Sequence, residues 1–530
     1  MRTSISAPAG GIRSFPVTEA TTRTVVRRVS WLVPDLALSL AALTLFYSLF
    51  LAGGYQSFFH DSDAGWHIRT GELILQTHSL PRTDPFSFTQ TGQPWFAWEW
   101  LADAAVAAIH SAAGLSGVAL FYAAALAAGV WIWVRFNWTA GGNFLLTALF
   151  ASPMLSTTDM HWLARPHLLS WIFLLLTVRF AIRPRFTPAA LTTIAGLSCL
   201  WANLHASFLM APAILLLYAA GAALPSLLFS GDPAESRSQM RGFLFAAAAA
   251  LGGTLLNPYG IALHRHVILY LTDGALLDRV GEFQSFNFHL AGSGQILLAL
   301  GLAAVGGVLS LARKELGSFL LICFLFACAL RSARGLPLLA LLALPLANGA
   351  ITKSLRSANG LRTSFRSFLE SSLRYSDGLR AIDRRSNGFV WVPLLLLIAA
   401  FGLRQPAVAA NTGFPPAEFP VAAASAIAKL PTEARLLASD KFGGYLIYRF
   451  AGSRKVFFDG RSDLYGAQFL KDYANLTQLR PGWRITLDRY RFTHALLPTD
   501  APLIEALESL GWTPLHHDAV ATLLARTSRN

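Results

Sequence analysis

The chain has 530 residues, of which 54% are hydrophobic and only 14% are charged, whereas about a quarter of the residues in an ordinary soluble protein are charged. Its apolar runs approach the roughly 20 residues that span a bilayer, and they are too long and too free of charge for the core of a soluble protein. The net charge of +14 comes from short basic blocks between those runs, as in cytoplasmic loops beside anionic headgroups, so the pattern indicates membrane lipid as a partner and excludes nucleic acid.

The first 30 residues contain five arginines among Ser, Thr, Pro and Gly, which is typical of a disordered basic tail. The apolar run that follows, residues 31–51, is too long for the core of a signal peptide and lacks a clear small-residue cleavage site. We therefore expect a retained first span, with residues 1–30 in the cytoplasm.

Residues 54–100 separate the first two apolar runs and are rich in acids, aromatics, His and Arg, which predicts an external loop that carries the chemistry. Asp61 and Asp63 stand two residues apart, and two carboxylates at that spacing on an extended segment can bind one hard cation through their oxygens. We expect a divalent cation, Mg or Mn, at these acids, followed by a helix over residues 70–76. The alternative is a pair of solvated loop acids.

The loop ends in Trp95, Trp98 and Trp100, and we expect these side chains to form an aromatic belt at the membrane surface rather than a platform for a sugar. Apolar residues resume at Leu101, and Gly114 is expected to separate an interfacial helix from the second span.

The remaining apolar runs alternate with polar segments in one consistent topology of about eleven spans. Short basic blocks mark the cytoplasmic side, and the most basic of them, residues 351–387, is expected there. The run at 261–271, which His and Arg interrupt, is expected to form an interfacial helix on the far side. The later spans are predicted at residues 144–155, 168–181, 191–201, 208–229, 243–256, 296–311, 319–330, 336–346 and 390–403.

This topology places polar residues from separate loops on the same far side of the membrane. Ionisable groups close to a membrane are costly and tend to be kept for function, so their common side predicts one functional site. For any single residue, an ordinary interfacial position is the alternative. The residues are Asp61, Asp63, Glu99, Asp159, Arg165, His205, Asn257 and Glu282.

Asp159 lies in the second external loop beside His161, and a second carboxylate there would let one cation bridge this loop and the loop of Asp61 and Asp63. A cation held by both loops would neutralise a phosphate or diphosphate leaving group. The alternative for Asp159 is a solvated helix terminus. Asp61, Asp63 and Asp159 are thus both the catalytic candidates and the candidate metal ligands.

Residues at the ends of the far-side spans are the candidate substrate-binding groups. Arg165 and Arg334 suit a donor phosphate because a planar guanidinium donates two parallel hydrogen bonds, although either side chain can instead extend to lipid headgroups. His205 can act as a base or a hydrogen-bond donor near neutral pH, or can simply cap its span. Glu282, an acid of a later external loop, and Arg69 complete the set.

From about residue 406 the composition becomes that of a soluble domain. Short buried strands are predicted at residues 435–439, 455–458 and 493–497, with helices at 468–474 and 503–510. We expect a small α/β domain on the same far side as the external loop.

Two stretches resemble the catalytic subunit of the oligosaccharyltransferases and, more broadly, the GT-C glycosyltransferases. Asp63 and Arg69 form a D-x5-R pattern after the first span, as in the first external loop of that subunit. Residues 439–445 (SDKFGGY) precede residues 455–461 (KVFFDGR) in an order and spacing similar to those of the family's W-W-D-Y-G motif and the strand after it. The two tryptophans and the aspartate that read an acceptor asparagine are missing, which argues against glycosylation of Asn sequons.

The resemblance implies an α-helical polytopic membrane protein, with a GT-C-like domain over residues 31–404 and a soluble α/β domain over residues 405–530. It implies a sugar donor carried on a polyprenyl phosphate, an acceptor that is a glycan, a lipid or a protein, and a role for Asp63 in positioning the acceptor or a divalent metal. The sequence has no glycine-rich phosphate-binding loop, so a nucleotide-sugar donor is not indicated.

The expected function is a glycosyltransferase of a bacterial inner (cell) membrane, with the N-terminus in the cytoplasm and the C-terminal domain in the periplasm. The alternative is a non-enzymatic scaffold, or a transporter of lipid-linked glycans, with a GT-C-derived fold. Transporters favour charges in the middle of spans and two related halves. Here the acids stand at the ends of spans and no internal duplication is visible, which favours the enzyme.

Overall fold

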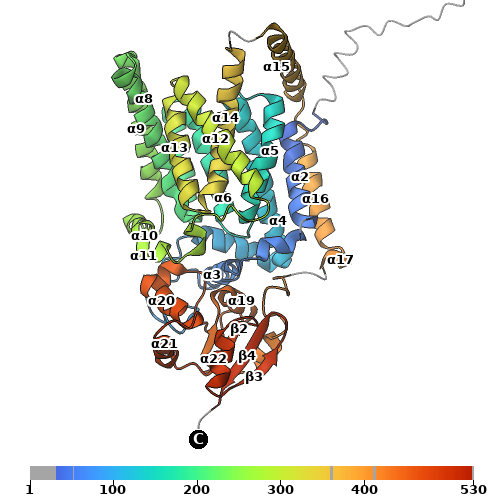
Figure 1. The fold of residues 1–530 in the computed structure, drawn as a ribbon, viewed down its shortest axis with the longest axis vertical. Helices are drawn as coiled ribbons and strands as arrows, with labels where there is room; N and C mark the ends of the chain where they lie inside the picture. Colours follow the sequence, from blue (N-terminus) through green and yellow to red (C-terminus); the bar gives the residue numbers. More distant parts are fainter. Residues whose placement is uncertain (1–30, 52, 359–361, 410–412, 528–530) are drawn as a thin grey trace, which may run out of the picture.

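The computed structural model describes residues 31–51, 53–358, 362–409 and 413–527, so the predicted basic tail, residues 1–30, lies outside the described residues. Figure 1 shows two parts stacked along the long axis of the molecule, a bundle of upright helices and a small α/β unit that ends at the C-terminus. A layer of short helices lies between the two parts.

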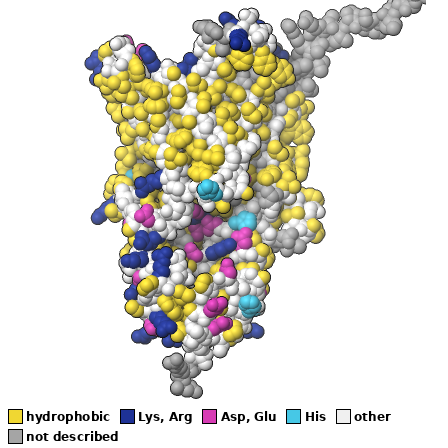
Figure 2. All heavy atoms as spheres, viewed as in Figure 1, with side chains coloured by type: hydrophobic (Ala, Val, Ile, Leu, Met, Phe, Trp, Pro, Cys, Tyr) yellow, Lys and Arg dark blue, Asp and Glu magenta, His cyan; other side chains and the backbone are white. Residues whose placement is uncertain are grey.

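The bundle consists of apolar helices, as the hydropathy predicts. They are α2 (Leu36–Phe50), α4 (Trp100–Ala140), α5 (Phe144–Thr158), α6 (His167–Ile182), α7 (Pro188–Leu204), α8 (Met210–Leu228), α9 (Pro233–Thr254), α12 (Ser293–Ala312), α13 (Leu316–Arg331), α14 (Gly335–Arg356) and α16 (Trp391–Leu403). Within the described ranges, four helical stretches are long and apolar enough to cross a membrane, namely α4, Ala206–Leu228, α12 and α14, and five shorter helices are also apolar. Figure 2 shows the flank of the bundle covered by hydrophobic side chains. The number of spans, about eleven, stays a prediction.

Local signals in the sequence set the ends of these helices. Asp35 caps α2 by accepting a hydrogen bond from the Leu38 N–H at 2.8 Å. Gly114 breaks α4, as predicted, because its φ of 63° lies in the left-handed region that glycine adopts without strain. The basic segment 351–387 contains α15 (Thr363–Asp383), which lies at the end of the bundle opposite the α/β unit (Figure 1).

A buried amide fixes the register of the central helix. α14 is buried along most of its length, and Asn348 Nδ2 donates to Asn137 Oδ1 on α4 and to Thr147 Oγ1 on α5, at 2.9 Å each. The backbone N–H of Asn143 donates to Asn348 Oδ1 at 2.9 Å. Since a polar group in an apolar interior must be paired, these bonds hold the three helices in one alignment.

The layer between bundle and α/β unit contains α3 (Asp63–Thr77), α10 (Ile261–Thr272), α11 (Gly274–Leu277) and the short helix α17 (Pro406–Ala409), together with the short 3₁₀ helices η1 (Gly54–Phe59), η2 (Asp159–His161), η3 (Ala206–Leu209) and η4 (Gly281–Phe283). The helix predicted at 261–271 is present as α10, and its interfacial position stays a prediction. Asp63 is not on an extended segment, and α3 begins at this residue rather than at residue 70. Asp61 Oδ1 accepts the Asp63 N–H at 2.9 Å, which satisfies a backbone donor at the helix start.

The C-terminal unit has a four-stranded sheet in the order β1-β2-β4-β3, so the predicted α/β class is confirmed. β1 (Leu436–Ala438) and β2 (His494–Pro498) are parallel, and β4 (Ala521–Arg526) is antiparallel to both β2 and β3 (Trp512–His517). The helices of the unit are α18 (Ala424–Ala428), α19 (Asp440–Arg449), α20 (Ser462–Thr477), α21 (Trp483–Tyr490) and α22 (Leu503–Ser509). The sequence analysis found β1 and β2 and missed β3 and β4.

The strand predicted at 455–458 is wrong, because this segment hydrogen-bonds to the external loop instead of the sheet. The Val456 N–H donates to the Phe86 carbonyl at 2.9 Å, and the Phe88 N–H donates back to the Val456 carbonyl at 3.0 Å. The external loop is thereby held against the C-terminal unit.

α3 is pressed against α19 through glycine. A Cβ atom at Gly65 would lie 2.1 Å from the Gly444 carbonyl oxygen, a distance that only glycine allows. Arg69, a predicted substrate-binding residue, belongs to this contact: its Nε and Nη2 donate to the Tyr448 carbonyl at 3.0 and 2.6 Å, and it pairs with Glu72. The packing of α3 on α19 thus sets where Asp63, at the start of α3, stands.

Candidate functional site

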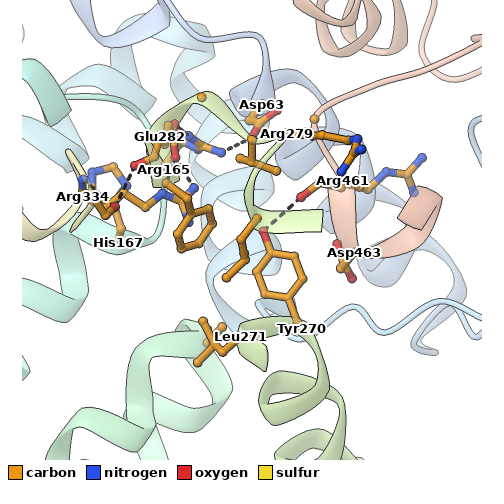
Figure 3. A pocket seen from close by; sticks show the side chains of 18 of the residues that line it. Asp63, Arg165, His167, Tyr270, Leu271, Arg279, Glu282, Arg334, Arg461 and Asp463 are labelled. Carbon is orange, nitrogen blue, oxygen red and sulfur yellow. Dashed lines mark hydrogen bonds and ion pairs between the residues drawn. The ribbon is translucent and has the colours of Figure 1, made fainter. Parts of the chain in front are cut away.

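A cavity of about 1560 Å³ lies where the bundle, the layer of short helices and the C-terminal unit meet. Its lining combines apolar side chains of the bundle, such as Leu174, Met210 and Leu338, with charged side chains, several of which Figure 3 shows. Most of the predicted site residues line it, which agrees with the expectation that they share one side. They are Asp61, Asp63, Arg165, His205, Glu282 and Arg334.

Arg165 stands at the centre of the acids in this cavity. Its Nη1 lies 2.7 Å from Asp61 Oδ2 and 2.7 Å from Glu282 Oε1, and its Nη2 pairs with Asp63. Glu282 also pairs with Arg334 (Figure 3). We call these five residues the Arg165 cluster; they come from the start of α3, the turn before α6, η4 and the turn before α14.

The acids Asp63 and Glu282 of the Arg165 cluster have pKa values that are shifted in opposite directions. Burial raises the pKa of Asp63 to about 7, which Arg165 opposes and the neighbouring carboxylates Asp61 and Glu282 reinforce. Burial also acts to raise the pKa of Glu282, but Arg165 and Arg334 together hold it well below its ordinary value. Glu282 is therefore ionised at neutral pH, whereas Asp63 exchanges its proton there.

The C-terminal unit closes on Asp63 from the other side. A Cβ atom at Gly460 would lie 2.0 Å from Asp63 Oδ1, so the turn at Gly460 approaches the carboxylate as only a glycine can. The next residue, Arg461, donates two hydrogen bonds to Asp459 at 2.8 and 2.7 Å, and pairs with Asp84 of the external loop at 2.8 Å. This buried ion-pair network holds the turn in place beside the cavity.

The expected aromatic belt is wrong for Trp95. This side chain is only 4% exposed, and the Arg461 guanidinium lies 4.7 Å from its ring centre, in a cation–π contact beneath the C-terminal unit. Trp98 lines the cavity with its ring 5.1 Å from that of His266, and the Trp100 Nε1–H donates to Asn203 at 2.9 Å. Trp95 is therefore buried inside the protein, whereas Trp98 and Trp100 are half-buried and packed against internal partners.

A second polar group at the cavity wall joins Glu99 and His205, which the sequence analysis named, to His67 and Asp103, which it did not. Glu99 stands between two imidazoles, with Oε2 3.6 Å from His67 Nε2 and Oε1 3.4 Å from His205 Nε2. Behind them, His67 Nδ1 lies 2.6 Å from Asp103 Oδ1. Burial raises the pKa of Glu99 to about 8, which Arg165 opposes and Asp63 reinforces. The signal for this group was present, since Glu99 and Asp103 are four residues apart where an apolar helix begins, a spacing that puts them on one face.

Asp159 is not brought to the cavity, although its neighbour His161 lines it. Both residues belong to the short helix η2, but Asp159 is exposed and does not line the cavity, and partial desolvation raises its pKa to about 6. The predicted set of Asp61, Asp63 and Asp159 is therefore not gathered around one point. Arg69 and Asn257 also lie outside the cavity lining.

The donor set does not fit the expected Mg or Mn ion. Among the described residues, no group of three or more His, Cys, Asp or Glu side chains is arranged to hold a metal. The carboxylates that could have supplied its oxygens converge on the Arg165 guanidinium instead.

Comparison with known proteins gives matches to solved structures but no match by sequence. No family model matches the sequence, and no curated protein matches it. Among solved structures, the oligosaccharyltransferase of Archaeoglobus fulgidus in the apo form matches with 11% identity and a TM-score of 0.51, over 88% of this chain and 69% of that one. The archaeal oligosaccharyltransferase AglB from Archaeoglobus fulgidus, in complex with an inhibitory peptide and a dolichol-phosphate, matches with 11% identity, the same coverage and a TM-score of 0.50. The chain therefore shares the fold of these oligosaccharyltransferases, as its resemblance to their catalytic subunit implied.

Proposed function

We propose that the protein is a GT-C-type glycosyltransferase of a bacterial inner membrane, which moves a sugar from a polyprenyl-phosphate-linked donor to an acceptor outside the cytoplasm. The observation that carries the proposal is the cavity itself, which joins an apolar wall in the helical bundle to the Arg165 cluster. A lipid-linked sugar has the same two parts, a long apolar chain and a phosphate. The complex of the structural neighbour AglB with a dolichol-phosphate supports this class of donor.

The donor would lie with its chain against the bundle and its phosphate at the arginines. The apolar wall comes from α6, η3, α8, α10 and α14, with Leu174, Leu209, Met210, Leu271 and Leu338. Arg334 lines the cavity and is 39% exposed, so it is open to an incoming phosphate, and Arg165 lies on the other side of Glu282. Guanidinium groups bind phosphate oxygens with two parallel hydrogen bonds, which fits both arginines for this role.

Asp63 is the proposed base for the acceptor. When the donor phosphate engages Arg165, the ion pair to Asp63 weakens and the carboxylate is released toward the cavity. The acceptor hydroxyl then attacks the anomeric carbon, its proton passes to Asp63, and the bond from that carbon to the phosphate oxygen breaks. The lipid phosphate leaves with the bonding electrons. A direct displacement of this kind inverts the configuration at the sugar.

The proposed orientation places the N-terminus and residues 351–387 in the cytoplasm and residues 405–530 in the periplasm. α15 and the α/β unit lie at opposite ends of the bundle, in agreement with that assignment (Figure 1). The acceptor would reach the cavity from the side of the C-terminal unit, whose wall carries Lys441, Asp463 and Lys471. A glycan, a lipid or a protein acceptor is compatible with such a wall.

The test is turnover of a panel of polyprenyl-phosphate hexoses by the purified protein in lipid nanodiscs, measured as release of the lipid phosphate. We expect at least one donor to be consumed by the wild type and none by Asp63→Asn. Asp377→Asn, an exposed aspartate of α15, is the matched control and should keep full activity. Full turnover by Asp63→Asn would remove this residue from the mechanism.

The same assay addresses the alternative of a non-enzymatic scaffold or a transporter of lipid-linked glycans. Such a protein would bind a fluorescent polyprenyl phosphate in the cavity without consuming any donor. Binding that Arg334→Met weakens, together with no turnover across the panel, would favour the alternative over the enzyme.

A further inference from the structure

The positive charge that faces the carboxylates of the Arg165 cluster comes from the protein itself, from the guanidinium group of Arg165. Arg165 is held by three carboxylates, at 2.7 Å from Asp61, at 2.7 Å from Glu282 and in direct contact with Asp63, and its side chain is only 16% exposed. The D-x-D pair that the sequence assigned to a divalent cation is thus turned toward a guanidinium.

The backbone around Arg165 is fixed to the same segment that carries the acids. The Ala164 N–H donates to the Phe58 carbonyl at 2.8 Å, which ties the residue before Arg165 to η1, just ahead of Asp61. Pro166 follows directly and restricts the backbone at the start of α6. The backbone of Arg165 is therefore held in place relative to Asp61 and Asp63, the acids with which its guanidinium group pairs.

The charges of the cluster explain why a further cation has no place. The cluster contains three carboxylates and two guanidinium groups, those of Arg165 and Arg334. When all five groups are ionised, one negative charge remains unpaired, and one proton on Asp63 neutralises it. Buried charges are stable only when paired, so a divalent ion entering this set would leave an unpaired positive charge. Without Arg165, the three carboxylates would face Arg334 alone, and the excess would equal the charge of one divalent cation. Carboxylate oxygens are also the ligands that Mg²⁺ and Mn²⁺ prefer.

We infer that Arg165 replaces the divalent cation at this site, so that the wild-type cluster binds none and becomes a metal site when the guanidinium is removed. This inference stands on the contacts of Arg165 and does not require the proposed transferase activity.

The test is titration of the purified full chain in lipid nanodiscs with Mn²⁺, in phosphate-free buffer at neutral pH, with free Mn²⁺ measured by electron paramagnetic resonance. We expect no Mn²⁺ at this site in the wild type. Arg165→Met should bind one Mn²⁺ at least tenfold more tightly than the wild type, and adding Glu282→Gln to that variant should abolish the gain. Arg165→Lys, which keeps a positive charge, should gain nothing.

Arg279→Met is the matched control, because Arg279 lines the same cavity but donates to the carbonyl of Ala275, on the short helix α11 just before it. It should bind Mn²⁺ as weakly as the wild type, and any Mn²⁺ held elsewhere on the protein would appear equally in both. Two results would overturn the inference: a Mn²⁺ site in the wild type that Asp63→Asn removes, or a folded Arg165→Met that binds no Mn²⁺. If Arg165→Met does not fold, Arg165→Gln takes its place, and the wild-type titration decides in either case.

Discussion

The backbone of Gly460 lies directly against the carboxylate of Asp63, so that a Cβ atom at Gly460 would stand 2.0 Å from Asp63 Oδ1. These residues are almost 400 positions apart in the chain, one at the start of α3 and the other in the C-terminal unit. Asp63 is therefore held from two sides, by Arg165 of the bundle and by the turn at Gly460. The C-terminal unit is part of the site wall and not an appendage to the membrane part.

Gly460→Ala should displace either the Asp63 side chain or the turn that contains residue 460, and should thereby lower the activity. The added methyl group has no room beside a carboxylate, and overpacking of this kind costs about 1–3 kcal/mol. We expect donor turnover in nanodiscs to fall at least tenfold, together with a lower midpoint of thermal unfolding. Gly378→Ala on α15, where a Cβ meets nothing within 4 Å, is the control; it should leave turnover unchanged and should not lower the unfolding midpoint, because alanine favours a helix over glycine. Normal activity of Gly460→Ala would show that Asp63 does not need this contact.

The rate of transfer should rise with pH through about 7. Burial raises the pKa of Asp63 to about 7, so below that pH the carboxyl is protonated and cannot accept the acceptor proton. Glu282→Gln removes a neighbouring negative charge that contributes to the raised pKa, and the midpoint of the pH–rate profile should move to lower pH. Profiles of kcat/KM for the wild type and this variant test the assignment, and an unmoved midpoint would point to another titrating group.

A protonated carboxyl should be detectable at Glu99. Burial raises the pKa of this acid to about 8, so it carries a proton at pH 7 and loses it as the pH rises through about 8. Infrared difference spectroscopy should show the C=O stretch of a buried carboxylic acid that disappears over that range. Glu99→Gln should lack this band, whereas Asp63→Asn should keep it. A spectrum of Glu99→Gln identical to that of the wild type would contradict the raised pKa.

Arg461→Met should destabilise the protein severely. Arg461 is 2% exposed and pairs with Asp459 and Asp84, so its loss leaves two buried carboxylates without a cation, at a cost of about 3–5 kcal/mol. Arg489→Met is the control, because Arg489 pairs with Asp472 at the surface, where such pairs contribute about 0–1 kcal/mol. Denaturant unfolding in detergent compares the two variants, and equal losses would mean that the Arg461 network does not stabilise the unit.

Removal of divalent cations should leave turnover intact. If Arg165 takes the place of a metal, dialysis against EDTA should change the rate of donor consumption less than twofold. Arg279→Met and the wild type should respond alike. A rate that falls strongly in EDTA and recovers when Mn²⁺ is added would show that the ion is required. Arg165 would then not take the place of a metal, despite its contacts with the three carboxylates.

The amino-acid sequence by itself determined the class of the protein and the side on which its polar residues gather. Hydropathy is a local property, so it identified the apolar helices, the break at Gly114 and the start of a soluble α/β part, and the alternation of spans placed Asp63, Arg165 and Glu282 on one side. β1 and β2 were also found, because buried strands are apolar wherever they pair.

Only the tertiary structure decided which partner each charge meets. Arg165 reaches Asp63 across 102 positions and Glu282 across 117, and no local pattern predicts contacts at that range. The same holds for residues 455–458, whose backbone pairs with residues 86 and 88 of the loop before α4. Solvation preferences act on each segment alone, whereas ion pairs and close backbone contacts arise only when distant segments pack together.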